Sequence, residues 1–217
     1  MPNNNLSQEV IMAIPKGRIL DQLVKLLDKA GIKLEDDFYG DSRKLKFATN
    51  FDFLKVIKCR SYDAATFVAY GAADFGICGS DVIDEFAYKN LYEFLDLEIG
   101  KCRLSIAGNQ EMSDPLLQEE TKVATKYPNL TKEFFASRAI RADIIKLNGA
   151  IELATQMGLC DYIVDLVSTG NTLKENGLQE FCSISKVSSK LVINRSSFAV
   201  RNSQISQILN LFIDATN

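Results

Sequence analysis

The residues best suited to chemistry in this sequence follow a short apolar segment at 162–166, which predicts a β-strand. Small, polar or hydroxyl residues come next: Ser168, Thr169, Gly170, Asn171 and Thr172. Backbone N–H groups at such a turn point toward one locus, the hydroxyls add donors, and a helix beginning at 173 would add its positive dipole end. The pattern indicates a phosphate-binding loop, although a capped turn has the same pattern. Asp165, near the strand end, could hold ribose hydroxyls or a metal-bound water.

Two cations form the second candidate site, directly after a predicted strand at 9–14. Lys16 and Arg18 flank Gly17, which lets the backbone come close to a ligand. Ligands of open α/β sheets bind outside the carboxyl ends of the strands. The turn is therefore a candidate anion site, with two solvated surface charges as the alternative interpretation.

Four further residues could belong to the same chemistry. Asp81 begins a predicted helix after a glycine turn, where its ordinary role is to cap that helix. Arg43 and Arg60 are isolated arginines, and such residues are ordinarily solvated or ion-paired at the surface. Glu152 could face the same locus as Asp165, or it could be an exposed acid in the first turn of a helix.

Composition excludes several classes of site. The sequence has no histidine, so Ser-His-Asp triads, Cys-His dyads, imidazole bases and HExxH metal sites are ruled out. A net charge of −3 lacks the basic excess of nucleic-acid binders, and we expect small anions as partners and no nucleic acid. The five cysteines are odd in number and form no C-x-x-C pair, which argues against a disulfide framework or a zinc site.

The same features predict a cytoplasmic protein. Unpaired cysteines are typical of a reducing compartment. The polar segment 1–8 lacks the pattern of a secretory signal. The longest charge-free stretch, 202–213, is too short to cross a bilayer, so we expect no membrane partner.

Strands and helices alternate along nearly the whole chain, which predicts an α/β architecture with largely parallel sheets. The predicted strands are 9–14, 45–49, 53–58, 75–78, 102–107, 122–125, 144–147, 162–166 and 186–193. The predicted helices are 19–30, 61–69, 81–88, 128–139, 152–157 and a final one containing 205–213. Because the middle of the chain repeats the pattern with its own phosphate-type loop, we expect two lobes around a central cleft. Lobe I comprises 1–98 and 188–217, and lobe II comprises 99–187.

Four segments together resemble one family, the ATP phosphoribosyltransferases: 13–18, 71–81, 147–154 and 165–173. The resemblance runs in order over essentially the whole chain. It implies a fold like that of type II periplasmic binding proteins. It also implies a glycosyltransferase that joins ATP to 5-phosphoribosyl-1-pyrophosphate, giving N1-(5-phosphoribosyl)-ATP and pyrophosphate, the first step of histidine biosynthesis. Mg²⁺ is expected on the substrates and not on a protein metal site.

With this resemblance, the candidate residues receive roles. Lys16, Arg18 and Arg43 are assigned to the pyrophosphate and the ATP phosphates, with Arg60 and Asp81 also on the ATP side. The loop from Ser168 to Thr172 is assigned to the 5-phosphate of phosphoribosyl pyrophosphate. Asp165 and Glu152 are assigned to the ribose hydroxyls.

The resemblance also implies partners. The chain is similar to the short form of the family, without the histidine-sensing domain that long forms carry. We therefore expect self-association and a regulatory subunit similar to a histidyl-tRNA synthetase, together forming a hetero-octamer. The sequence departs from the family pattern at Ala150, where serine is usual, and at Thr155, where proline is usual. The loop has one acid, Asp165, in place of an acidic pair, which argues against a metal held by the loop.

Three other functions share some of these features. A non-catalytic binding module for a small anion would have the same fold. The effector domain of a transcription regulator would need a DNA-binding helix pair, for which 1–8 offers little room. A phosphoribosyltransferase acting on a different base would keep the phosphate loop.

Overall fold

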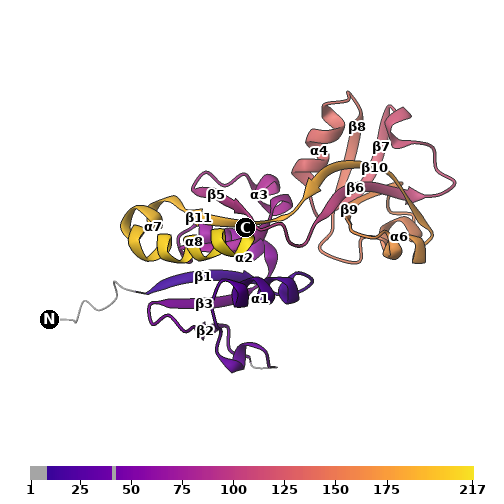
Figure 1. The fold of residues 1–217 in the computed structure, drawn as a ribbon. Coiled ribbons are helices and arrows are strands. Elements are labelled where there is room, and N and C mark those ends of the chain that lie inside the picture. The colour runs from indigo at the N-terminus through magenta and orange to yellow at the C-terminus, as the bar shows by residue number, and fades with distance from the viewer. Residues whose placement is uncertain (1–8, 41–42) are drawn as a thin grey trace. The chain divides into compact units, whose positions relative to one another are not determined.

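The computed structural model describes residues 9–40 and 43–217, and the polar segment 1–8 lies outside the described residues. The chain divides into two compact units, each built on one mixed β-sheet with helices (Figure 1). Unit 1 comprises Met1–Ile83, Ala87–Gly100 and Ser188–Asn217, and unit 2 comprises Asp84–Phe86 and Lys101–Val187. The predicted α/β class is confirmed.

Unit 1 contains a six-stranded sheet and five α-helices among its described residues. The strands are β1 (Val10–Pro15), β2 (Lys46–Ala48), β3 (Leu54–Cys59), β4 (Phe75–Gly79), β5 (Leu91–Asp96) and β11 (Ser189–Asn194). The helices are α1 (Leu20–Lys29), α2 (Ser61–Ala69), α3 (Ser80–Phe86, whose last three residues count with unit 2), α7 (Arg195–Val200) and α8 (Asn202–Thr216). A short 3-10 helix, Asp36–Phe38, lies in the segment predicted as a loop.

The strands of unit 1 follow the order β2-β3-β1-β4-β11-β5. The central strand β1 pairs in parallel with β3 and with β4, as the alternation of strands and helices predicts. In contrast, β11 pairs antiparallel with both β4 and β5, and β2 pairs antiparallel with β3. The sheet is therefore parallel at its centre and antiparallel toward both edges, because β11 runs between β4 and β5 in the opposite direction and β2 forms the antiparallel edge beside β3.

Helices cover both faces of this sheet. Successive strand residues point to opposite faces, so Met12 and Ala13 on β1 enter different cores. Met12 packs in a cluster with the apolar stripes of α1 and α8, which include Leu23 and Phe212. Ala13 packs in a second cluster with α2, through residues such as Val68. Figure 1 shows α8, in yellow, running beside the strands of this unit.

Unit 2 contains a five-stranded sheet in the order β10-β6-β9-β7-β8. Its strands are β6 (Cys102–Asn109), β7 (Glu120–Thr125), β8 (Arg141–Lys146), β9 (Tyr162–Val167) and β10 (Leu178–Val187). Its complete helices are α4 (Pro128–Ala136), α5 (Leu153–Gln156) and α6 (Asn171–Glu175), with a 3-10 helix at Pro115–Leu117. β7 pairs in parallel with β8 and β9, whereas β6 pairs antiparallel with β9 and β10.

The helices of unit 2 also lie on two faces of their sheet. Ala124 on β7 packs in a cluster with Ala154 of α5 and Leu173 of α6. The next residue, Thr125, points to the other face, where its hydroxyl lies 3.5 Å from the hydroxyl of Thr131 on α4. The loop that follows β9 therefore leads into α6, which packs together with α5 on one face of the sheet.

One predicted strand was wrong. The segment 186–193 was expected to form a single strand, but β10 ends at Val187 and β11 begins at Ser189, in two different sheets. No proline or glycine marks this division. Each half is instead defined by its hydrogen-bonding partners, which are β6 for β10 and β4 with β5 for β11.

Candidate functional site

The phosphate-type loop lies between β9 and α6, as the sequence predicted. Gly170 has φ 81°, in the left-handed region, and forms the N-cap of α6. The amide of Asn171 donates a long hydrogen bond of 3.4 Å to the hydroxyl of Thr169. Ser168, Thr169, Asn171 and Thr172 are exposed. Because α6 has five residues, its dipole is short, and the donors for an anion come mainly from the loop itself.

Asp165 lies within β9 and not at its end. Its Oδ1 accepts a 2.8 Å hydrogen bond from the amide of Leu166, and the residue is half-buried. Strand pairing places Asp165 opposite Ser105 of β6. Glu152 is the half-buried N-cap residue of α5, and its carbonyl oxygen accepts a 2.9 Å hydrogen bond from the hydroxyl of Thr155. The threonine that departs from the family pattern thus stabilises the first turn of α5.

Sequence reasoning missed a cluster of side chains beside this loop. Arg103 of β6 donates from Nε to Glu180 of β10 at 2.5 Å and pairs with the same carboxylate through NH2. Its NH1 donates a 3.2 Å hydrogen bond to the carbonyl oxygen of Ser168. The hydroxyl of Ser105 donates to Glu180 at 2.8 Å. No local motif marks this cluster, because its members lie up to 77 residues apart in sequence.

The charges of this cluster shift each other's protonation. The hydrogen bond from Arg103 lowers the pKa of Glu180 below its usual value, burial opposes this, and the hydrogen bond from Ser105 lowers the pKa further. The same bond to Glu180 raises the pKa of Arg103. Glu180 is therefore a stable carboxylate at neutral pH, and it holds a permanent cation next to the loop.

The cationic turn after β1 has the backbone that its glycine predicts. Gly17 has φ 109°, which side-chain-bearing residues rarely adopt, so the turn requires glycine. The amide of Lys16 donates a 2.8 Å hydrogen bond to the carbonyl of Cys59, at the end of β3. Lys16 and Arg18 are both exposed. The turn therefore presents its cations beside the carboxyl ends of two parallel strands.

A cavity of about 480 Å³ opens at this edge of unit 1. Its lining includes four cations, one acid and three large apolar residues: Lys16, Lys46, Lys58, Arg60, Asp63, Leu45, Ile57 and Phe67. Lys58 is fixed by a 2.9 Å hydrogen bond to the carbonyl of Phe38, while Lys46 pairs with Glu9. Sequence reasoning missed Lys46 and Lys58. Lys58 lies at the same strand end as Arg60, and this shared position was a signal that could have identified it.

The thiol of Cys59 also lines this cavity. Burial, and to a smaller degree nearby Asp63, raise its pKa to about 11, while Lys16 opposes the shift. The thiol is therefore protonated at neutral pH and donates weakly to the carbonyl of Ile14 at 3.7 Å. A nucleophilic role for Cys59 does not fit this protonation state.

The remaining predicted residues have different settings. Arg43 is exposed in the segment that leads into β2. Asp81 is 5% exposed in the first turn of α3, where its carboxylate lies so close over Gly79 that a Cβ there would meet Oδ1 at 1.9 Å. The structure thus brings Lys16 and Arg60 to one cavity in unit 1, while in unit 2 Asp165 lies within β9 and the loop follows the end of that strand.

Other features of the described residues complete the picture. A larger cavity of about 540 Å³ in unit 1 is lined by residues such as Tyr70, Tyr88 and Arg201, and contains none of the predicted site residues. Across residues 9–40 and 43–217, no three His, Cys, Asp or Glu side chains gather in a way that could hold a metal ion. In the same ranges, no helix combines the length and apolar character needed to cross a membrane.

Comparison with known proteins identifies the family. The sequence profile described as ATP phosphoribosyltransferase matches residues 60–213. An ATP phosphoribosyltransferase of Novosphingobium aromaticivorans is 49% identical over 207 residues, covering 94% of this chain and 93% of that protein.

Solved structures agree. The ATP phosphoribosyl transferase (HisG:HisZ) complex from Thermotoga maritima contains a chain with a TM-score of 0.81 and 30% identity, covering 95% of this chain and 98% of that one. The periplasmic VFT2 domain of Bordetella pertussis BvgS has a TM-score of 0.60 at 14% identity, covering 95% and 87%, and shares the fold alone. With an α/β fold of this type and the family's signature loop in place, the chain belongs to the ATP phosphoribosyltransferases, which join ATP to 5-phosphoribosyl-1-pyrophosphate in the first step of histidine biosynthesis.

Proposed function

We propose that each unit contributes one part of the substrate-binding machinery for this reaction. The unit 1 cavity, which Lys16 and Arg60 line, takes ATP and the departing pyrophosphate together with Arg18, Arg43 and Asp81 of the same unit. In unit 2, Ser168, Thr169, Gly170, Asn171 and Thr172 bind the 5-phosphate, and Asp165 with Glu152 binds the ribose hydroxyls. The observation that carries this assignment is the 480 Å³ cavity, because its lining combines cations with apolar side chains, which suits a purine nucleotide.

The residues fit the chemistry of the reaction. Adenine N1 is neutral and has a free lone pair, so it needs positioning and not deprotonation. When N1 attacks C1 of the phosphoribosyl group, pyrophosphate leaves with a high negative charge. Orientation of the substrates and neutralisation of that charge are therefore the main tasks of the protein. Arginine and lysine side chains perform the second task without a histidine base.

We further propose that Mg²⁺ arrives bound to the substrates. Mg²⁺ keeps several waters and prefers phosphate oxygens with few carboxylates. Asp165 is the single acid in the segment 165–172, a donor set that suits ribose hydroxyls better than a dedicated metal site. Carboxylate removal at Asp165 should then weaken binding of ribose 5-phosphate in buffer that contains a chelator as well as in buffer with Mg²⁺.

The complex from Thermotoga maritima suggests the kind of partner. We propose that this chain self-associates and works with a regulatory subunit similar to a histidyl-tRNA synthetase, in a hetero-octamer. We propose a cytoplasmic location, because its substrates are intracellular metabolites and its five cysteines are free thiols. Mass measurement of the purified chain with and without the subunit tests the assembly.

One experiment tests the assignment of the two substrate sites. The chain is incubated with ATP, phosphoribosyl pyrophosphate and Mg²⁺, and both pyrophosphate release and the ribosylated nucleotide are measured. Variants of the unit 1 cavity should mainly change the kinetics of ATP and the turnover number. Variants of the unit 2 loop should mainly change the KM for phosphoribosyl pyrophosphate. The opposite division would reject the assignment, and binding of both substrates without product would favour a non-catalytic anion-binding module.

A further inference from the structure

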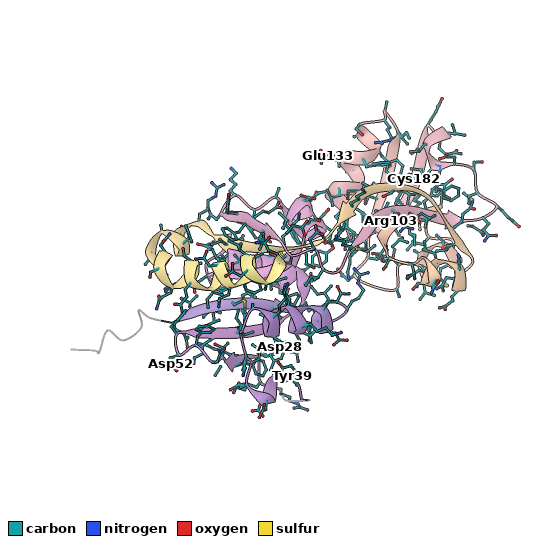
Figure 2. All side chains as sticks on the ribbon, in the orientation of Figure 1. Asp28, Tyr39, Asp52, Arg103, Glu133 and Cys182 are labelled. Atoms are coloured by element: carbon teal, nitrogen blue, oxygen red, sulfur yellow. The ribbon has the colours of Figure 1, made fainter. Side chains whose placement is uncertain are left out.

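A network of hydrogen-bonded side chains holds the loop of unit 2 at the carbonyl of its first residue, Ser168. It runs from Ser105 to Glu180, from Glu180 to Arg103, and from Arg103 NH1 to the carbonyl oxygen of Ser168 at 3.2 Å. Figure 2 labels Arg103 on β6 and Cys182 on the neighbouring strand β10, which also carries Glu180. This network thus joins the loop to β10, which follows it closely in sequence, and to β6, whose Arg103 lies 65 positions from Ser168.

The guanidinium of Arg103 is fixed before it reaches the loop. Its Nε and NH2 both bond to Glu180, an arrangement that fixes the plane of the fork and leaves NH1 pointing in one direction. The side chains of Arg103 and Glu180 are 37% and 24% exposed, so the pair is partly shielded from water. Ser105, which is fully buried, donates to Oε1 of Glu180, the same oxygen that accepts from Nε of Arg103.

The position of the Ser168 carbonyl determines the direction of a neighbouring donor. In a trans peptide, the C=O of one residue and the N–H of the next point in opposite directions. The described residues contain no cis peptide bond. A hydrogen bond that draws the Ser168 carbonyl toward Arg103 therefore turns the N–H of Thr169 away from it. Gly170, with φ 81°, could otherwise allow the adjoining peptides to rotate.

We propose that Arg103, locked by Glu180, is a positioning residue that orients the Ser168–Thr169 peptide so that the Thr169 N–H points into the 5-phosphate site. Without this bond, rotation of the peptide would place a carbonyl oxygen where a phosphate oxygen should lie, and like charges would repel. We infer that Arg103 acts through the backbone, because each of its three guanidinium nitrogens already donates a hydrogen bond within the protein, Nε and NH2 to Glu180 and NH1 to Ser168. This inference rests on the proposed role of the loop in binding the 5-phosphate.

Substitutions at Arg103 and Glu180 distinguish a positioning role of Arg103 from simple electrostatic attraction of the substrate. Arg103→Met should raise the KM for phosphoribosyl pyrophosphate about tenfold or more, the order expected when a hydrogen bond from a charged group is lost. Glu180→Gln removes a negative charge near a polyanion, so attraction alone predicts a lower KM. If Glu180 positions Arg103, the same substitution should raise that KM. Arg103→Lys keeps the charge without the fork and should give an intermediate KM.

The readouts separate a local from a general effect. Affinity for ribose 5-phosphate should fall with Arg103→Met and Glu180→Gln, while affinity for pyrophosphate and the KM for ATP should stay within about twofold, the range of a neutral surface change. Glu120→Gln in the exposed pair with Arg141 is the matched control in the same unit and should leave all three unchanged. Circular dichroism melting checks that each variant is folded.

The outcomes can be told apart. A Thr169→Ala/Thr172→Ala variant with a normal KM for phosphoribosyl pyrophosphate would reject the proposed role of the loop. If that variant has a raised KM but Glu180→Gln has a normal or lowered one, the loop assignment stands and the positioning role of Arg103 is overturned. Equal loss of ATP and ribose 5-phosphate binding in folded Arg103→Met would also overturn it.

Discussion

The amide of Lys16 donates a 2.8 Å hydrogen bond to the carbonyl oxygen of Cys59, which joins the ends of the parallel strands β1 and β3. This bond holds the cationic turn after β1 beside the N-terminus of α2, where Arg60 stands. Two cations that are 44 positions apart in the chain therefore line one cavity.

Removal of a cation from the turn should slow the reaction. Lys16→Ala and Arg18→Ala are each expected to lower kcat by about 10²-fold, because a charged donor acts most strongly on the departing pyrophosphate. Arg43→Ala should behave in the same way. Steady-state pyrophosphate release measures kcat, and Lys29→Ala, at the exposed end of α1, is the control. Wild-type turnover in all three variants would remove these cations from the mechanism.

Loss of the loop hydroxyls should affect one substrate. Thr169→Ala with Thr172→Ala is expected to raise the KM for phosphoribosyl pyrophosphate about tenfold, since two donors to a phosphate are lost. The KM for ATP should change much less. Initial-rate kinetics with each substrate varied in turn provides the comparison, with Ser203→Ala on α8 as the control hydroxyl. A larger effect on the KM for ATP would mean that the loop has been assigned to the wrong substrate.

The Arg103–Glu180 pair should make stability depend on pH in one direction. Because Arg103 lowers the pKa of Glu180, the carboxylate stabilises the fold above its unfolded pKa of about 4.3. This contribution is lost as pH falls through the lower, folded pKa. The difference in urea midpoint between the wild type and Glu180→Gln should therefore be largest near neutral pH and shrink below about pH 4. A difference that grows on acidification would contradict the pairing.

Gly76 should be intolerant of a side chain. A Cβ at this position would lie 2.8 Å from the carbonyl oxygen of Ala13 and 2.9 Å from Val68 Cγ2. The backbone of β1 cannot move without disturbing the sheet, so Gly76→Ala should destabilise the protein by about 1–3 kcal/mol. Gly149→Ala, where no atom lies within 4 Å of the added Cβ, is the control. Equal denaturation midpoints for the two variants would argue against close packing at Gly76.

Free histidine should leave the isolated chain active. We assign histidine sensing to the proposed regulatory subunit, because we propose a role in substrate binding for each of the two units. Rates of pyrophosphate release at rising histidine concentration, with and without the subunit, test this expectation. Inhibition of the chain by itself would place the sensor within it.

Elements with strong local signals were predicted well. The apolar spacing at 19–30 predicted α1, which spans Leu20–Lys29 and is followed by Gly31 with φ 71°. The helical spacing near the C-terminus predicted α8, whose apolar face packs in the core of unit 1. Amphipathic helices are read reliably because the period of their apolar residues reflects the face that they bury.

Elements defined by distant partners were not predicted. β5 is an edge strand whose Tyr92 is 52% exposed, so its pattern lacks the apolar run of a buried strand. Most of β10 and the short helix α7 were missed as well. β10 has irregular register with β6 between Glu180 and Cys182, which disturbs the alternation that would reveal it.

The sequence by itself determined the family, the α/β class and the types of residue in the loop and the cationic turn, because these depend on local order along the chain. Tertiary structure decided which distant side chains support them. Arg103 reaches Ser168 across 65 positions, and Lys58 joins Lys16 at one cavity, only because strands pair in a particular order. Strand pairing is set by the free energy of the whole core, so no short segment contains this information.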